Sequence, residues 1–257
     1  MYIYYIPTHG FNDLMGRIIW FVQVCQTYNV VLLVDGERGQ YGVDFSKYFT
    51  FPQPYIITDG AAIRALLAKH PITLTIPPKR NPPITYFGRL RGNHTMICVR
   101  NLRFFPCSYP IFSQLIIQEG VKQECHRRRA LLGPTYLGIQ VRNTDYTCDY
   151  KALYEEHKAT IHACPEVYLA TDCQEVLVFF RSKGVAVKNF ITFQKGDRPL
   201  HMSSVPNAVK FMDMLCDIYL IGMAESVLSV SQGGFIQLML QCNQNKNLLA
   251  RQFGSSG

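Results

Sequence analysis

An arginine stands where an apolar run of the sequence ends. Residues 138–145 read GIQVRNTD, which places Gln140, Arg142 and Asp145 at the end of a segment with the pattern of a buried strand. A guanidinium can donate two parallel hydrogen bonds to one phosphate, so Arg142 is a candidate phosphate ligand at the mouth of a cleft. The alternative interpretation is a local ion pair between Arg142 and Asp145 that holds a loop.

Two further apolar segments end in groups that suit the same ligand. EVYLATD ends in Thr171 and Asp172, and SVLSVSQGG ends in hydroxyls, an amide and a glycine that open a helix: Ser229, Ser231, Gln232 and Gly233. A helix start of this kind exposes backbone N–H groups in the positive end of the helix dipole, which binds phosphate. Together with Arg142 it suits a diphosphate, whereas SQGG alone can also be a helix cap without a ligand.

Alternating strands and helices must position these groups. In the second half of the chain we expect strands at 136–142, 166–172, 185–193 and 226–231. Helices are expected between and after them, at 149–162, 174–184, 207–224 and 233–241. This alternation predicts a parallel sheet, in which ligands bind beyond the carboxyl ends of the strands.

The first half of the chain begins in the same way. We expect a strand at 2–6, a helix at 14–28 and a strand at 29–35, then loops and short strands over 36–108 and a helix at 112–132. Gly133 and Pro134 end that helix. The predicted fold class is therefore α/β, with two Rossmann-like parallel-sheet domains that face a cleft. Residues 1–132 form the N-terminal domain and 133–253 the C-terminal, nucleotide-binding domain.

Composition and missing motifs exclude several classes of protein. The chain has 257 residues with 48% hydrophobic content, which excludes a disordered chain. Its formal net charge of +8 favours anionic partners, but the basic residues are dispersed and no nucleic-acid-binding signature is present. A Walker A motif and a GxGxxG motif are both missing, which argues against a P-loop ATPase or a dinucleotide enzyme. No acidic D-x-D pair is present either, so we expect no metal ion and no cofactor.

Nine cysteines lie within apolar runs and show no CxxC spacing. This pattern predicts buried thiols in a reducing compartment, not a disulfide framework or a zinc site. The start, MYIYYIPTHG, lacks the features of a signal peptide. No run approaches the roughly 20 apolar residues of a membrane span. The expected location is therefore the cytoplasm.

The three segments resemble the ordered motifs of a known family. GIQVRNTD is similar to the H-V-R-R-T-D motif of the fucosyltransferases with two Rossmann-like halves, which include the α1,6-, nodulation and protein O-fucosyltransferases. EVYLATD resembles their second motif, and LCDIYLIGMAESVLSVSQGG resembles their third. The resemblance covers about residues 136–240, and HGFN near the start resembles a Gly-x-Gly-Phe-Asn loop of one branch. It implies a GT-B-like fold.

The resemblance also implies roles for individual residues. Arg142 would bind the β-phosphate and Asp145 would brace it, while Asp172 would shape the donor pocket and Asp217 would contact guanine. The remaining donor contacts would come from the loops: Gly10, Phe11, Asn12, Thr171, Ser229, Ser231, Gln232 and Gly233. Gln140 stands where the family has a histidine that helps to define the guanine pocket. A sugar donor with a different nucleobase is therefore the alternative.

The catalytic base has two candidates. An acidic residue of the family occupies the position of His9, and a histidine with a pKa near roughly 6.5 can accept a proton from a hydroxyl. The alternatives are that Asp13 is the base or that His9 is only a loop residue.

The predicted function is an inverting, metal-independent glycosyltransferase that transfers L-fucose from GDP-fucose to a hydroxyl of a glycan or glycoprotein. The same fold and chemistry with a UDP-pentose donor such as UDP-xylose is the close alternative. A non-catalytic nucleotide- or glycan-binding protein is the rival from another class, and a nucleic-acid-binding module is the third possibility.

Overall fold

The computed structural model describes residues 1–76, 84–90, 95–99, 108–143, 148–191, 193 and 203–254. The chain divides into two compact units, residues 1–118 and 119–257. Within the described part of the chain, no helix has both the length and the apolar character that crossing a membrane requires.

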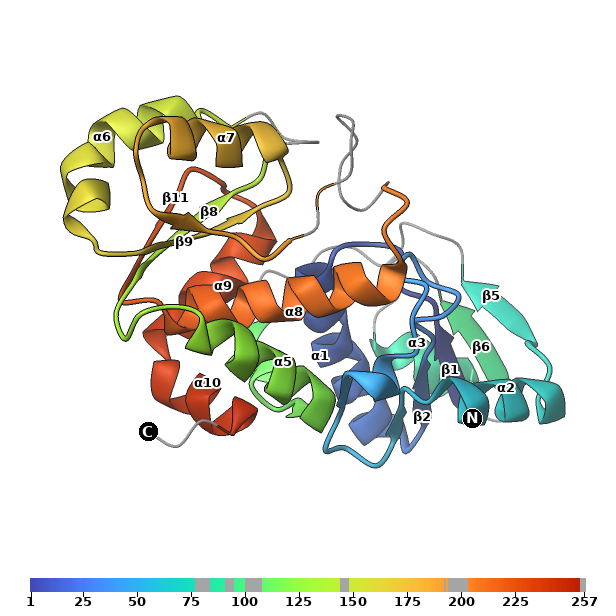
Figure 1. The fold of residues 1–257 in the computed structure, drawn as a ribbon. Helices are drawn as coiled ribbons and strands as arrows, with labels where there is room; N and C mark the ends of the chain where they lie inside the picture. Colours follow the sequence, from blue (N-terminus) through green and yellow to red (C-terminus); the bar gives the residue numbers. More distant parts are fainter. Residues whose placement is uncertain are drawn as a thin grey trace. The chain divides into compact units, whose positions relative to one another are not determined.

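Unit 1 is built on a parallel sheet of five strands (Figure 1). In spatial order its strands are β4 (Ile56–Ile57), β2 (Val31–Val34), β1 (Tyr2–Tyr5), β6 (Met96–Val99) and β5 (Leu74–Ile76). The chain moves from β1 outward to β4 and then returns on the other side of β1. The carboxyl end of β1 therefore lies at the point where the strand order reverses, which is where open α/β sheets bind ligands.

Helices cover both faces of this sheet. The face that carries Tyr5 packs on α1 (Phe11–Tyr28), where the rings of Tyr5 and Phe21 lie 5.0 Å apart. The face that carries Tyr4 and Leu33 packs on α2 (Gly60–Lys69) through Ile63. The smaller elements of the unit are η1 (Phe45–Lys47), β3 (Phe49–Thr50), α3 (Ile84–Leu90), α4 (Tyr109–Phe112) and β7 (Ile116–Ile117).

Two expectations for the first half of the chain are wrong in detail. The middle segment supplies the expected short strands, β4, β5 and β6, but it also holds the helix α2, which was not expected there. The helix expected at 112–132 begins only at Glu119, since Ile116–Ile117 instead pairs as β7 with β3. That pairing is a contact between distant segments, which local sequence does not reveal.

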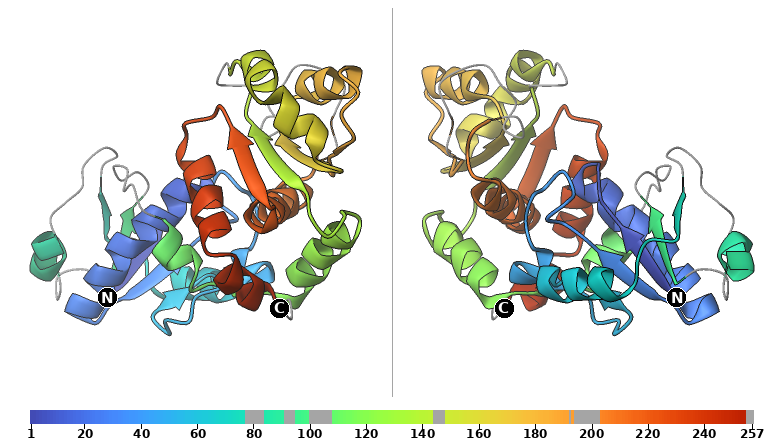
Figure 2. Two further views of the ribbon diagram at one scale, coloured as in Figure 1. Left: turned by 90° about the vertical axis from the view of Figure 1, so that its left-hand side faces the viewer. Right: turned by 90° about the vertical axis from the view of Figure 1, so that its right-hand side faces the viewer.

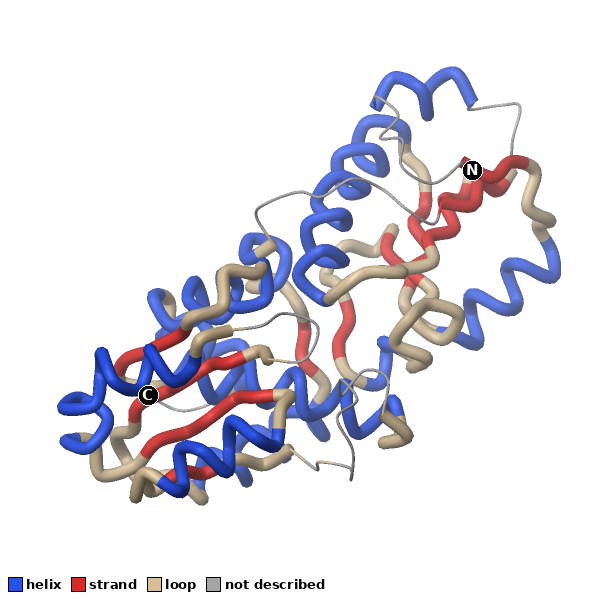
Figure 3. Tube along the Cα trace, turned by 90° about the horizontal axis from the view of Figure 1, so that it is seen from above, coloured by secondary structure: helices blue, strands red, loops and turns tan. Residues whose placement is uncertain are grey.

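Unit 2 holds a second parallel sheet, of four strands. Their spatial order is β10 (Val187–Lys188), β9 (Val167–Thr171), β8 (Leu137–Val141) and β11 (Ser226–Ser229). Figure 3 shows these strands running side by side between helices, and in Figure 2 β11 lies next to β8. The strand order reverses between β8 and β11. Of the strand expected at 185–193, only Val187–Lys188 pairs in the sheet.

Two pairs of helices sandwich this sheet (Figure 1). On one face α6 (Tyr150–Ala163) and α7 (Gln174–Ser182) pack on the apolar side chains of β8 and β9. On the other face lie α8 (Asn207–Met223) and α9 (Gly234–Gln244), followed by α10 (Lys246–Phe253). The buried core therefore has the two apolar layers expected of a Rossmann-like unit.

Helix α5 (Glu119–Ala130) belongs to unit 2, although the sequence placed the domain boundary after residue 132. It packs on α8, and the Arg128 guanidinium donates to Asp213 at 2.5 Å. Glu124, one turn earlier on α5, accepts from the same guanidinium at 2.7 Å. This buried ion pair attaches the helix to the second unit.

Gly138 in β8 allows α8 to approach the sheet closely. A Cβ atom at this position would lie 2.9 Å from the Cβ of Ala224 and 3.1 Å from Cδ1 of Ile221. The Ala224 side chain is fully buried and has no torsion through which it could move away. Gly138 thus sets the distance between the helix layer and the strand that carries Arg142.

We expect Gly138→Ala to lower the free energy of unfolding by about 1–3 kcal/mol, because overpacking at this contact forces the helix or the strand to shift. Urea denaturation of the full chain measures the change. Gly120→Ala on α5 is the matched control, since nothing lies within 4 Å of a Cβ there and alanine is the better helix former. Equal effects of the two substitutions would contradict the role given to Gly138.

Candidate functional site

The carboxyl ends of β8 and β11 bring two predicted loops together. Ser229 pairs in register with Gln140, so Arg142 and Ser231 follow at the same edge of the sheet. The backbone N–H of Arg142 donates to Oγ of Ser231 at 3.1 Å, although 89 residues separate them. Two of the segments singled out from the sequence are therefore one site.

A chain of hydrogen bonds shapes the loop between β11 and α9. The Ser229 hydroxyl donates to Oε1 of Gln140 at 2.9 Å, and the backbone N–H of Ser231 donates to the Ser229 oxygen at 3.0 Å. Gln140 is buried and Ser231 is half-buried. Gln140 thus holds the serine loop in place, and its side-chain oxygen is engaged by Ser229.

The loop continues directly into the start of α9. Gln232 and Gly233 are exposed, and Gly233 occupies the N-cap position without a side-chain cap hydrogen bond. No capping side chain therefore competes for the first N–H groups of α9, which lie in the positive end of the helix dipole. The role of this helix start as a phosphate cradle stays a prediction.

Arg142 is held beside Asp172, which follows β9. Its Nε lies 4.0 Å from Oδ2 of Asp172, and 41% of its side chain is exposed. The same carboxylate accepts from the backbone N–H of Asn143 at 3.1 Å. The guanidinium is oriented by this neighbour and still reaches solvent, as a ligand-binding arginine must.

Other side chains complete this edge of the sheet. Oδ1 of Asn143 accepts from the backbone N–H of Cys148 at 3.0 Å, and Sγ of Cys148 lies 3.7 Å from Oγ of Ser231. Thr171 is buried, and its hydroxyl accepts from the backbone N–H of Cys173 at 3.3 Å. Asp145 lies outside the described residues.

Asp217 lies inside unit 2, away from this edge. Its carboxylate accepts a hydrogen bond from the Tyr168 hydroxyl, and both side chains are buried. Tyr168 stands three residues before Thr171, which corresponds to about 10 Å along a strand. Burial raises the pKa of Asp217 to about 7. The predicted contact of Asp217 with guanine stays a prediction, and the partner that the structure gives it is Tyr168.

In unit 1, His9 follows β1 at the point where the strand order reverses. Its Nδ1 lies 2.8 Å from a terminal nitrogen of Arg17, and its carbonyl oxygen accepts from the Tyr41 hydroxyl at 2.8 Å. Asp13, in the first turn of α1, is half-buried. Burial lowers the pKa of His9, the Arg17 charge lowers it further, and the Asp13 charge opposes both.

The three residues after His9 differ in what they expose. Gly10 is exposed at the N-cap of α1. Phe11 is buried, with its ring edge-on to those of Phe49 and Phe112, so it packs in the core. Asn12 is also buried and accepts from the Ser108 hydroxyl through Oδ1, while its Nδ2 has no hydrogen-bond partner among the described residues. The predicted donor contact of Asn12 stays a prediction.

Sequence reasoning missed Arg17 and Ser108. The signal for Arg17 was present, because a single arginine interrupts the otherwise apolar run LMGRIIWFV of α1. A charge at such a position is buried and must find a partner. Ser108 offered no comparable signal, since its contact with Asn12 spans 96 positions of the chain.

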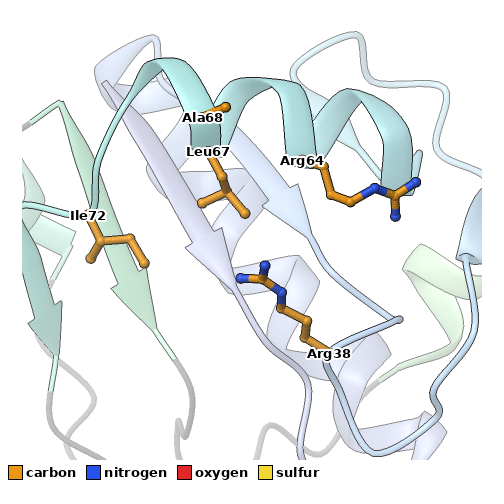
Figure 4. A pocket seen from close by; sticks show the side chains of 5 residues that line it. All are labelled: Arg38, Arg64, Leu67, Ala68 and Ile72. Atoms are coloured by element: carbon orange, nitrogen blue, oxygen red, sulfur yellow. The ribbon is translucent and has the colours of Figure 1, made fainter.

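A separate hollow of about 520 Å³ lies beside α2 (Figure 4). Leu67, Ala68 and Ile72 line it, with Arg38 and Arg64 at its rim. Arg64 forms an ion pair with Glu37, and the Arg38 side chain lies 3.9 Å from Asp35. In contrast to the edge of unit 2, no helix start is among the described residues that line this hollow, so the hollow offers an anion side chains alone.

Among the described residues, no group of three or more His, Cys, Asp or Glu side chains is arranged to hold a metal ion. Arg142, Ser231 and the start of α9 are the groups on this edge that suit an anionic ligand.

No known protein-family model matches the sequence, and no curated protein matches it. Solved structures match the fold. The fucosyltransferase NodZ from Bradyrhizobium has a TM-score of 0.60 at 16% identity, over 93% of this chain and 92% of that chain. NodZ α1,6-fucosyltransferase soaked with GDP-fucose also has a TM-score of 0.60, at 15% identity over 92% and 91%. POFUT1 in complex with GDP has a TM-score of 0.54 at 9% identity, over 94% of each chain.

This similarity confirms the predicted fold class, which is α/β and GT-B-like with two Rossmann-like parallel sheets. It also confirms, at the level of the fold, the resemblance to fucosyltransferases that the three motifs indicated.

The buried Asp217 predicts a pH dependence of stability. The folded-state pKa of Asp217, about 7, is raised above the unfolded value of about 3.9. The contribution of the protonated carboxyl to the free energy of unfolding is therefore complete below about pH 4 and is lost as the pH rises toward about pH 7. The difference corresponds to about 4 kcal/mol at most. We expect Asp217→Asn to gain stability relative to wild type as the pH rises from about pH 4 to about pH 7, and to keep a constant difference above that, as measured by urea denaturation.

Glu155→Gln, an exposed carboxylate on α6, serves as the control for this measurement. A difference between Asp217→Asn and wild type that stays constant with pH would contradict the burial of a protonated Asp217.

Proposed function

We propose that the protein is a glycosyltransferase that transfers L-fucose from GDP-fucose to a hydroxyl of a glycan or glycoprotein. The observation that carries the proposal is the junction of the Arg142 loop with Ser231 and the start of α9, at the reversal point of the second sheet. A junction of this kind suits a diphosphate. The match to NodZ soaked with GDP-fucose supports the choice of donor.

Charge stabilisation of the leaving group would supply most of the catalysis. The acceptor oxygen attacks the anomeric carbon from the side opposite the diphosphate, so the configuration inverts. As the bond from carbon to the phosphate oxygen breaks, Arg142 and the N–H groups of α9 stabilise the negative charge that develops on the diphosphate. These groups take the part that a divalent ion would otherwise play, so the proposed reaction is metal-independent.

The nucleobase of the sugar donor is the less constrained part of the proposal. Gln140, at the position where the fucosyltransferases have a histidine, is bonded to Ser229 and holds the serine loop. In this proposal the Gln140 side chain therefore supports the phosphate-binding loop and does not contact the nucleobase. UDP-xylose remains the alternative donor, with the same fold and chemistry.

A thermal-shift panel tests the donor. GDP, GDP-fucose, GDP-mannose, UDP, UDP-xylose and UDP-glucose are each added to the full chain, with EDTA and again with Mn²⁺. A ligand that binds only the folded state raises the melting temperature by mass action. We expect GDP and GDP-fucose to raise the melting temperature, each by the same amount with EDTA as with Mn²⁺.

A shift produced by the UDP compounds alone would contradict the guanine donor, and a shift that needs Mn²⁺ would contradict the metal-independent site. If no compound stabilised the protein, the nucleotide-sugar proposal itself would fail. Binding of GDP-fucose without any transfer to acceptor glycans would identify the non-catalytic alternative.

Removing the Arg142 guanidinium tests its role in transfer. We expect Arg142→Ala to lower kcat/KM for GDP-fucose by about 10²–10³-fold, because one preorganised donor to the leaving group is lost. Arg142→Lys should restore only part of the activity, since an ammonium cannot form the two parallel hydrogen bonds.

Arg181→Ala is the matched control, because Arg181 is an exposed arginine on α7 of the same unit. Its rate should equal that of the wild type. Unchanged turnover in Arg142→Ala would remove Arg142 from the mechanism.

A further inference from the structure

Arg17 is a buried arginine whose described partners are not carboxylates. Only 2% of it is exposed, in the middle of the apolar face of α1. Its guanidinium contacts Nδ1 of His9 at 2.8 Å and the Tyr5 hydroxyl at 3.5 Å, and its Nε has no hydrogen-bond partner. A charge buried in this way is costly, so its position calls for a role beyond packing.

The contact with Arg17 determines which nitrogen of His9 carries the proton. An arginine has five N–H donors and no acceptor, so the nitrogen that faces it must offer a lone pair. Nδ1 of His9 is that nitrogen, and the Thr8 hydroxyl also lies 2.9 Å from it. A neutral imidazole then carries its proton on Nε2. The ring presents a donor to a ligand, and its lone pair is already in use.

The groups around His9 keep the ring neutral. Arg17 and Asp13 act on it from α1, Tyr41 donates to its carbonyl oxygen from the loop after β2, and Tyr5 of β1 contacts Arg17. Burial lowers the pKa of His9 first, and the Arg17 charge lowers it further. The Asp13 charge acts in the opposite direction. A second proton on Nδ1 would also point at the guanidinium, so protonation would break the contact.

We propose that Arg17 is a positioning residue that holds His9 as a neutral Nε2–H donor, so that His9 donates a hydrogen bond to an oxygen of a substrate and does not remove a proton from the acceptor hydroxyl. This inference rests on the proposed function. The acceptor proton passes to Asp13, the carboxylate in the first turn of α1. The acceptor oxygen bonds to the anomeric carbon while the diphosphate leaves with the electron pair of the broken bond.

The tautomer of His9 is tested in the full-length protein without any substrate. Nitrogen NMR of ¹⁵N-histidine-labelled protein separates a protonated from an unprotonated ring nitrogen, and His9→Gln assigns the signal. We expect an unprotonated Nδ1 and a protonated Nε2 from about pH 6 to about pH 8. A protonated Nδ1, or a titration with an ordinary pKa near about 6.5, would overturn the proposal.

Arg17 itself is tested by two variants. In Arg17→Gln we expect the His9 pKa to return toward about 6.5 and the pH–rate profile to gain a new acidic limb. Arg17→Lys keeps the charge and one donor, so it should restore the wild-type profile. A purely structural role would lower the melting temperature of Arg17→Gln without changing the pH–rate profile, which would contradict the proposal.

The proton acceptor is tested by a pair of substitutions at the same loop. His9→Gln keeps an N–H donor, so transfer should fall by less than about tenfold, whereas Asp13→Asn should lower kcat by about 10²–10⁴-fold. The reverse order would identify His9 as the base. If Arg17→Gln does not fold, the wild-type NMR signal still tests the position of the proton on His9, and the His9→Gln and Asp13→Asn variants still test which residue is the base. If the protein transfers no sugar, the proposed function fails, and the NMR measurement decides the inference about His9 separately.

Discussion

The parallel pairing of β8 with β11 is the interaction on which the candidate site depends. Parallel strands end at the same edge of a sheet, so this pairing places the Arg142 loop beside the serine loop although 89 residues separate them. Gly138 makes room for α8 on one face of β8, while α6 and α7 fill the other. A one-residue shift in the register of β8 against β11 would move these contacts by one residue and turn each side chain of the shifted strand to the opposite face of the sheet.

Both units hold buried polar groups that are hydrogen-bonded and others that are not. In unit 2, Gln140 is engaged by Ser229 and Asp217 by Tyr168, whereas Arg128 and Asp213 each keep one atom without a partner among the described residues. In unit 1, the buried Asn12 and Arg17 each keep a nitrogen without a hydrogen-bond partner, next to the loop that carries His9. Unsatisfied donors are costly in a core, and both side chains belong to α1, the helix that follows His9.

The loops at the two reversal points differ in their chemistry. The loop of unit 2 carries a half-exposed arginine beside the start of a helix, and both are positively polarised groups that suit an anion. Unit 1 supplies a histidine whose proton is placed by a buried arginine, and a carboxylate in the next turn. The division follows from the architecture, because in each sheet the functional loops lie at the point where the strand order reverses.

The sequence by itself determined the alternation of strands and helices in the second half, the position of Arg142 at a strand end, and the glycine-rich start of a helix after the last strand. These features are local, since periodicity and helix-start signals extend over a few residues. Only the tertiary structure decided that three short strands of 36–108 join the sheet of unit 1, that helix α5 joins unit 2, and that Gln140 is bonded to Ser229 and Asp217 to Tyr168. It also decided the proton position on His9, because Arg17 reaches that ring only once α1 has packed against β1. Such contacts join residues from different elements, and no local pattern of the sequence records which of them meet.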